Sequence, residues 1–250
     1  MIAKPTPPRR PRWRSLALLA LSLAPLLWPL HHLAERYYQD ELASQNRQTL
    51  DLYVANLLGT LHRYETLPQI LGDLPALRGV LADPFRLEAV TNANRLLKDI
   101  VQQTGAEVMY LMDVSGNTLA ASNWDKHDTF VGRNFAFRPY FNEAMAGHLG
   151  RFFGQGTTSA KRGYFFAAAV RDGDTIIGVL VVKVDLDHTE SLWGKTPEQL
   201  LVTDHNGVVI LTSRTDWRFR ATRELTADER EAIASVQPYP TLDPRPLLIN

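Results

Sequence analysis

The most informative stretch for the fold of this 250-residue chain is Gly163–Leu186, GYFFAAAVRDGDTIIGVLVVKVDL. Gly163–Val170 and Thr175–Leu186 are rich in β-branched and aromatic residues, which predicts two strands. Asp172-Gly173-Asp174 separates them and is a strong turn signal, because Gly and Asp tolerate the backbone conformations of a tight hairpin. The stretch therefore predicts an antiparallel β-hairpin.

Three further strands are predicted before this hairpin: Val108–Asp113, Thr118–Ser122 and Arg151–Phe153. A short helix is expected over Arg138–Gly147, because Pro139 suits a first helical turn and Gly147 suits the position past the end. Five antiparallel strands, with a helix and loops between the second and third, predict an α+β domain of the kind that senses small ligands.

The sequence contains an internal repeat. Met112–Ser122 (MDVSGNTLAAS) matches Thr203–Ser213 (TDHNGVVILTS) in frame, with Asp-x-x-Gly after an apolar strand in both. A second domain of the same type is therefore expected to start near Leu200, with a helix over Thr226–Val236. Little chain follows and Gln237–Asn250 contains no apolar strand run, so we expect this second domain to be incomplete.

The N-terminal region has the charge pattern of a membrane anchor. Ser15–Ala34 contains no charged residue, and at ~1.5 Å per residue a helix of about 20 residues spans the ~30 Å hydrocarbon layer. Basic residues precede it and acidic residues follow it, which places the N-terminus in the cytoplasm and the rest outside. The alternative is a cleaved signal peptide, which also exports the remaining chain. The preceding basic residues are Lys4, Arg9, Arg10, Arg12 and Arg14.

A long helix is expected directly after this segment, from Glu35 to about Glu65, because apolar residues recur there at helical spacings. Such a helix is predicted to act as a stalk that forms a homodimer. Two shorter helical stretches follow within Leu67–Gly105, the second opening at Asp83-Pro84. The predicted organisation is a cytoplasmic tail (1–14), a transmembrane helix (15–34), stalk and helical segments (35–105), a membrane-distal PAS-like domain (106–190) and an incomplete membrane-proximal one (191–250).

Composition argues against several classes of function. The chain has 27 basic and 27 acidic residues, whereas a general nucleic-acid binder needs a basic excess. It has no cysteine, and its histidines do not occur at metal-ligand spacing. No catalytic motif of a hydrolase, metalloprotease or nucleotide-binding protein is present. We therefore expect no catalytic residue, metal or cofactor, and no nucleic-acid partner.

Lys183 is the most informative single residue. Strand alternation places it on the same face as Val179 and Val181, and the opposite face of that strand is apolar as well. A buried ammonium is unfavourable unless it is paired. Lys183 therefore either extends to water at the end of the strand, pairs with a nearby acidic residue, Asp185 or Asp187, or binds an anionic ligand.

Arg138 supplies a second cation at the start of the predicted short helix, where a guanidinium can hold a carboxylate in bidentate geometry. Aromatic and hydroxyl side chains occur nearby in the sequence and suit the wall of a pocket. This set predicts a site for a small dicarboxylate and leaves a monocarboxylate or an amino acid open. The candidate wall residues are Phe135, Thr157, Thr158, Ser159, Tyr164 and Phe166.

Three motifs resemble the periplasmic region of C4-dicarboxylate transport sensor histidine kinases: Arg133–Gly147, Gly156–Ala167 and Gly178–Leu186. The resemblance implies a tandem PAS-like (double Cache) sensor whose membrane-distal domain binds succinate, malate or fumarate. It implies that Arg138 and Lys183 hold the ligand, with help from hydroxyls at Thr157 and Ser159. The family usually carries Tyr where this chain has Phe135, so one hydroxyl contact is missing here.

The resemblance implies the input part of a two-component sensor kinase in the inner membrane, truncated before the kinase and therefore not an enzyme itself. One alternative is the Cache domain of a chemoreceptor or another receptor for a different small carboxylate. The other is an exported hydrolase that uses Asp113 or Asp125 with His127.

Overall fold

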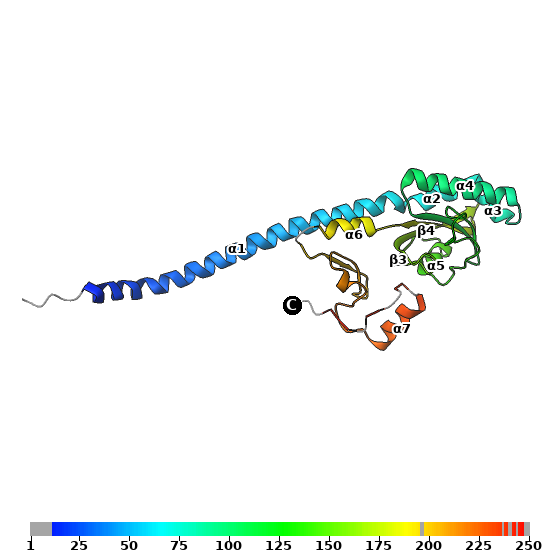
Figure 1. Cartoon of the computed structure of the whole chain (residues 1–250). Helices are drawn as coiled ribbons and strands as arrows, with labels where there is room; N and C mark the ends of the chain where they lie inside the picture. Colours follow the sequence, from blue (N-terminus) through cyan, green and yellow to red (C-terminus); the bar gives the residue numbers. More distant parts are fainter. Residues whose placement is uncertain (1–11, 196–197, 237, 240–241, 244, 248–250) are drawn as a thin grey trace, which may run out of the picture. The chain divides into compact units, whose positions relative to one another are not determined.

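The computed structural model describes residues 12–195, 198–236, 238–239, 242–243 and 245–247. The chain divides into two compact units, Met1–Asn56 and Leu57–Asn250. The described part of unit one, from Arg12 onward, is helical, and unit two contains the predicted sheet. The elements are labelled in Figure 1.

Helix α1 runs without interruption from Arg12 to Glu65, which confirms the long helix expected from Glu35. The predicted membrane segment, Ser15–Ala34, lies in its first part, where most side chains fall outside the described residues. Among the helices that are described, none combines the length and apolarity needed to cross a bilayer. The membrane segment therefore stays a prediction.

Three helices follow α1: α2 (Leu67–Gly72), α3 (Pro75–Ala82) and α4 (Leu87–Thr104). The prediction of two stretches was wrong in number, because Pro75 starts a helix of its own after Gly72. Nor does α4 open at Asp83-Pro84. The Asp83 side chain accepts a hydrogen bond from the N–H of Phe85 in a local turn, and the helix begins at Leu87.

The central sheet has five antiparallel strands, which confirms the predicted number, and their order is β2-β1-β5-β4-β3. The predicted hairpin pairs β4 with β5 through Asp172↔Thr175, and Gly173 at its turn adopts a φ of +56°. β5 lies in the middle of the sheet, between β1 and β4. The strands are β1 (Val108–Asp113), β2 (Thr118–Ala121), β3 (Gly150–Gln155), β4 (Arg162–Asp172) and β5 (Thr175–Val184).

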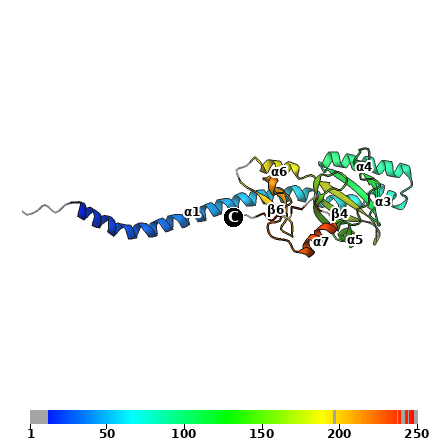
Figure 2. The ribbon, with the colours of Figure 1, turned by 60° about the horizontal axis from the view of Figure 1, so that its bottom comes forward.

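Both faces of this sheet are covered, which buries β5 almost completely. Helices α2, α3 and α4 pack on one face, and α5 (Pro139–Met145) packs on the other (Figures 1 and 2). The core under α5 is dominated by aromatic side chains, among them Tyr110, Phe135 and Tyr140. A long buried side chain that points to the α5 face therefore enters this aromatic core.

The predicted repeat has the same backbone structure in both copies. The carboxylates of Asp113 and Asp204 each accept backbone N–H groups of their own turn, and Gly116 and Gly207 adopt φ values of +82° and +79°. Each copy also has a register shift in its strand pair, between Leu111 and Met112 and between Val202 and Thr203. The left-handed glycine is what a turn of this type requires.

The second copy is built from a smaller set of elements. A two-stranded sheet, β6 (Leu201–Thr203) with β7 (Val209–Thr212), follows helix α6 (Asp187–Trp193) and precedes α7 (Ala227–Val236), with a short 3₁₀ turn, η1 (Thr215–Trp217), between β7 and α7. Helix α7 confirms the predicted helix to within one residue.

Candidate functional site

Lys183 of β5 points to the α5 face of the sheet. It pairs with Phe165 on β4 and with Val108 on β1, and cross-strand partners share one face. Its side chain is fully buried. The ammonium lies 2.8 Å from a carboxylate oxygen of Glu107 and donates hydrogen bonds to the Ser159 hydroxyl at 3.2 Å and to the Lys161 carbonyl at 3.0 Å.

Neither predicted acidic partner binds Lys183, so that part of the prediction was wrong. The carboxylate of Asp187 instead pairs with Arg162. Glu107 lies immediately before β1, and its N–H donates to the Lys183 carbonyl, which brings the two side chains together across the sheet. Burial raises the pKa of the Glu107 carboxyl and lowers the pKa of the Lys183 ammonium, while each charge partly offsets the shift of the other.

Gly163 makes room for the Lys183 side chain. A Cβ atom at this position would lie 2.7 Å from the Lys183 Cε and 2.9 Å from the carbonyl oxygen of Val184. Both distances are below ordinary van der Waals contact, so any side chain at this position displaces the lysine or the strand. Gly163 is therefore required because the Lys183 side chain and the Val184 carbonyl lie so close to it, and not because the backbone turns there.

Arg138 is the residue before α5 and is also buried, with an exposure of 2 %. Its guanidinium donates to the carbonyls of Gln155 and Val236, both at 2.9 Å. Val236 is the last residue of α7, so the cation meets the negative end of that helix. The guanidinium also lies over the rings of Phe137 and Phe152, at 5.0 and 5.3 Å from their centroids.

The two predicted cations meet the same short segment at the end of β3. Arg138 binds the carbonyl of Gln155, and a Cβ on the next residue, Gly156, would lie 3.6 Å from the Lys183 Nζ. Phe165 and Phe152 line the region between the cations: the Lys183 Nζ is 5.7 Å from the Phe165 centroid, and the two rings are 6.3 Å apart. The structure therefore brings Arg138 and Lys183 to one side of the sheet around the β3–β4 loop.

The predicted hydroxyl residues lie in this loop. Ser159 contacts Lys183 directly, whereas Thr157 and Thr158 line a cavity of about 380 Å³ whose lining includes neither Lys183 nor Arg138. Phe135 lies in the wall of the same cavity and is 5 % exposed. The remaining lining residues are His127, Asp128, Arg133 and Asn134.

Phe135 continues into a buried aromatic cluster. Its ring is tilted against Tyr110 with centroids 5.6 Å apart, and the hydroxyls of Tyr110 and Tyr140 lie 2.7 Å from each other. Burial raises the pKa of Tyr140 to about 12, so both phenols stay protonated at neutral pH. The ring of Tyr140 also stacks on Phe165, at 5.3 Å, which joins this cluster to the Lys183 environment.

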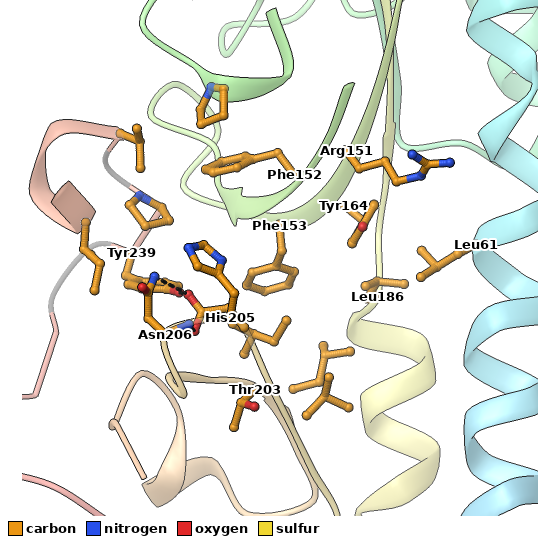
Figure 3. A pocket seen from close by; sticks show the side chains of 18 of the residues that line it. Leu61, Arg151, Phe152, Phe153, Tyr164, Leu186, Thr203, His205, Asn206 and Tyr239 are labelled. Atoms are coloured by element: carbon orange, nitrogen blue, oxygen red, sulfur yellow. Dashed lines mark hydrogen bonds between the residues drawn. The ribbon is translucent and has the colours of Figure 1, made fainter. Parts of the chain in front are cut away.

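Tyr164 and Phe166 do not belong to this site, because β4 presents Phe165 to the α5 face and therefore turns its two neighbours to the opposite face. Their rings are 5.0 Å apart on that other face. Tyr164 lines a larger cavity of about 810 Å³, in which it lies near Leu61, Leu186 and Arg151 (Figure 3). This larger cavity is mainly apolar, and neither Arg138 nor Lys183 lines it.

Several site residues were missed by the sequence analysis: Glu107, Arg133, Tyr110, Tyr140 as a hydroxyl partner, and Phe165. Phe165 could have been found from strand pairing, because the Asp172-Gly173-Asp174 hairpin fixes which residue faces Lys183. No local sequence pattern identifies Glu107 as a site residue, because its contact with Lys183 depends on the pairing of β1 with β5, which are far apart in the sequence.

The residues of the hydrolase alternative do not form a catalytic group. Asp113 accepts the N–H groups of its own turn, and Asp125 pairs with Lys98 at 2.5 Å. The His127 side chain is 97 % exposed. What the site offers is two buried cations beside aromatic rings and hydroxyls, which suits recognition of an anion.

Comparison with known proteins gives relatives of one kind, although no protein-family profile matches the chain. The chain is 65 % identical over 239 residues to a C4-dicarboxylate transport sensor protein DctB of Pseudomonas aeruginosa and 35 % identical over 187 residues to that of Rhizobium meliloti. The matches cover 96 % and 75 % of this chain but 39 % and 30 % of those relatives. The chain therefore spans less than half the length of these curated relatives.

Solved structures agree with this relationship. The sensor domain of the Vibrio cholerae histidine kinase DctB superposes with a TM-score of 0.78 at 32 % identity, covering 84 % of this chain and 81 % of that one. The ligand-binding domain of the Campylobacter jejuni chemoreceptor Tlp3 shares the fold alone, with a TM-score of 0.52 at 16 % identity over 68 % of this chain and 67 % of that one. By sequence and by structure, the chain belongs to the family of DctB sensor domains.

Proposed function

We propose that this chain is the extracytoplasmic sensing part of a two-component sensor histidine kinase and that it binds C4-dicarboxylates such as succinate, malate and fumarate. The observation that carries the proposal is the convergence of Arg138 and Lys183, both buried, on the segment Gln155–Gly156. A dicarboxylate offers one carboxylate to each cation. The names of the relatives, which are C4-dicarboxylate sensors, support the choice of ligand.

The ligand would enter through the cavity of about 380 Å³ and contact Thr157, Thr158, Ser159 and Phe135. Both cations have protein acceptors in this structure, so ligand carboxylates replace some of those hydrogen bonds as they bind. Replacing the Gln155 and Ser159 contacts changes the β3–β4 loop. Such a change in the loop is needed for a signal. A ligand shifts the equilibrium between two conformations only if it binds one of them more tightly than the other.

The proposal includes a membrane-anchored homodimer in the inner membrane, with the sensor domain in the periplasm. Leu42, Leu50 and Val54 lie on one side of α1, since they are spaced by multiples of four residues, and they are 57, 51 and 45 % exposed. An apolar stripe of this kind on a long helix suits the same stripe of a second copy. Cross-linking of a cysteine introduced at Leu50 tests this part separately from ligand binding.

Thermal unfolding of the full 250-residue chain in detergent, with and without ligand, tests the dicarboxylate. Succinate at about 100 times its dissociation constant is expected to add roughly 2.7 kcal/mol to the free energy of unfolding. Acetate and glutarate serve as controls for charge and length. A folded chain whose melting temperature does not respond to succinate, malate or fumarate contradicts the proposal.

A further inference from the structure

The charge of the candidate site does not match a dianion. Among the residues that the structure describes, the site contains two buried cations, Arg138 and Lys183, and the carboxylate of Glu107, whose side chain is 12 % exposed. Together these three groups carry one net positive charge. Transfer of the proton from Lys183 to Glu107 would leave that sum unchanged. A ligand with two carboxylates would therefore bring one negative charge more than the buried site can balance.

Lys183 is already surrounded by protein oxygen atoms. Its ammonium donates hydrogen bonds to the Ser159 hydroxyl and the Lys161 carbonyl, and a carboxylate oxygen of Glu107 lies 2.8 Å away as an ion-pair partner. A ligand carboxylate that binds this ammonium therefore comes close to the carboxylate of Glu107, whose side chain is 12 % exposed.

We propose that Glu107 is a specificity-determining residue of this site, and that its carboxylate makes the binding of a dianion dependent on the uptake of one proton. The proton passes from solvent to the Glu107 carboxylate, which raises the site charge from one to two positive charges. A monoanion of the same size binds without that proton. This inference rests on the proposed function, because it concerns how the dicarboxylate site selects its ligand.

The other charged groups around Glu107 do not supply the missing charge. Asp185, just after β5, adds negative charge, and Lys161 in the β3–β4 loop is exposed and screened by solvent. The lining of the cavity contains one basic and one acidic residue, Arg133 and Asp128, whose charges add to zero, and His127 is exposed. The raised pKa of Glu107, caused mainly by burial, is in the direction that makes proton uptake easier.

Calorimetry on the wild-type chain measures the proton directly. Succinate is titrated at pH 7.0, 7.7 and 8.4, above the range in which its own carboxyls titrate, in two buffers with different ionisation enthalpies. We expect the apparent binding enthalpy to differ between the buffers by the amount for one proton taken up. The dissociation constant is expected to rise by up to tenfold per pH unit, since one proton is linked to binding.

A pair of ligands and a pair of variants locate the proton. Succinamate, which replaces one carboxylate of succinate by an amide, is expected to bind the wild-type chain without a pH dependence. Glu107→Gln keeps an acceptor for Lys183 and removes the charge, so succinate should bind this variant with no proton uptake and at the same affinity across the pH range. Glu88→Gln, on an exposed side chain, is the matched control and should behave as wild type.

Three results separate the inference from the proposed function. Succinate binding with equal enthalpies in both buffers overturns the inference and leaves the function intact. Proton uptake that persists in Glu107→Gln overturns it as well, because the proton then resides elsewhere. Absence of succinate binding by a folded wild-type chain overturns the proposed function itself. If Glu107→Gln does not fold, the two buffers used with the wild-type chain still decide whether a proton is taken up.

Discussion

The Lys183 ammonium, on a side chain with no exposed surface, lies 2.8 Å from the carboxylate of Glu107, whose side chain is 12 % exposed. Removing one partner of such a pair leaves the other charge buried without compensation, which is more destabilising than removing both. The stability of this domain and its ligand chemistry therefore depend on the same two side chains.

Lys183→Met is expected to destabilise the unliganded chain by roughly 3–5 kcal/mol at pH 8, because Glu107 then stays buried alone. Burial raises the pKa of Glu107. A carboxyl whose pKa is higher in the folded than in the unfolded state stabilises the fold below the unfolded-state pKa, and that stabilisation is lost as pH rises through the folded-state value. Urea denaturation should therefore find the variant closer to wild type at pH 5 than at pH 8.

The double variant Lys183→Met with Glu107→Gln is the control for that experiment. It removes both charges, so it should recover part of the lost stability at pH 8 and show little pH dependence between pH 5 and 8. A Lys183→Met variant as stable as wild type at pH 8 would show that the pair does not stabilise the fold.

Arg138→Ala is expected to lower the free energy of unfolding by about 2–4 kcal/mol, because the carbonyls of Gln155 and Val236 lose a charged donor and a cavity forms between Phe137 and Phe152. It should also abolish stabilisation by succinate. Arg133→Ala at the exposed mouth of the cavity is the comparison, and its unliganded melting temperature should stay within the error of wild type. Thermal unfolding with and without succinate measures both effects.

Gly163→Ala is expected to destabilise the chain by about 1–3 kcal/mol, because its Cβ would come within 2.7 Å of the Lys183 Cε and 2.9 Å of a backbone carbonyl. Gly79→Ala provides a matched control in α3, where a Cβ meets no atom within 4 Å and alanine favours the helix. The control should be neutral or stabilising by up to about 1 kcal/mol. Equal melting temperatures for the two variants would contradict the packing around Lys183.

Glu190→Ala is expected to destabilise the chain by about 3–5 kcal/mol. The buried Glu190 carboxylate binds Arg162 at 2.5 Å, Arg218 at 2.8 Å and the N–H of Thr212 at 2.9 Å. This cluster joins β4 and α6 to β7, so its loss should allow the segment from β6 onward to exchange amide hydrogens faster than β1–β5. Hydrogen exchange read by mass spectrometry checks this, and uniform exchange across both parts would contradict it.

The elements of the fold could be predicted where the local pattern is unambiguous. Val108–Asp113 was predicted to the residue, because turn residues bound an apolar run on both sides. The boundaries of helices α2, α3 and α4 were harder to predict. Prolines signal boundaries, yet only packing decides whether Pro75 kinks a helix or starts a new one.

For the site, local patterns were enough to predict that Lys183 enters a buried face, because side chains alternate between the two faces of a strand and both faces of β5 are apolar. They also predicted that Arg138 starts a helix at Pro139. The partners of these two cations, in contrast, depend on how distant segments pack together. Glu107 reaches Lys183 through the pairing of β1 with β5, and Val236 reaches Arg138 from α7, 98 residues along the chain. Contacts between distant segments depend on strand order and packing, which no local pattern of residues encodes.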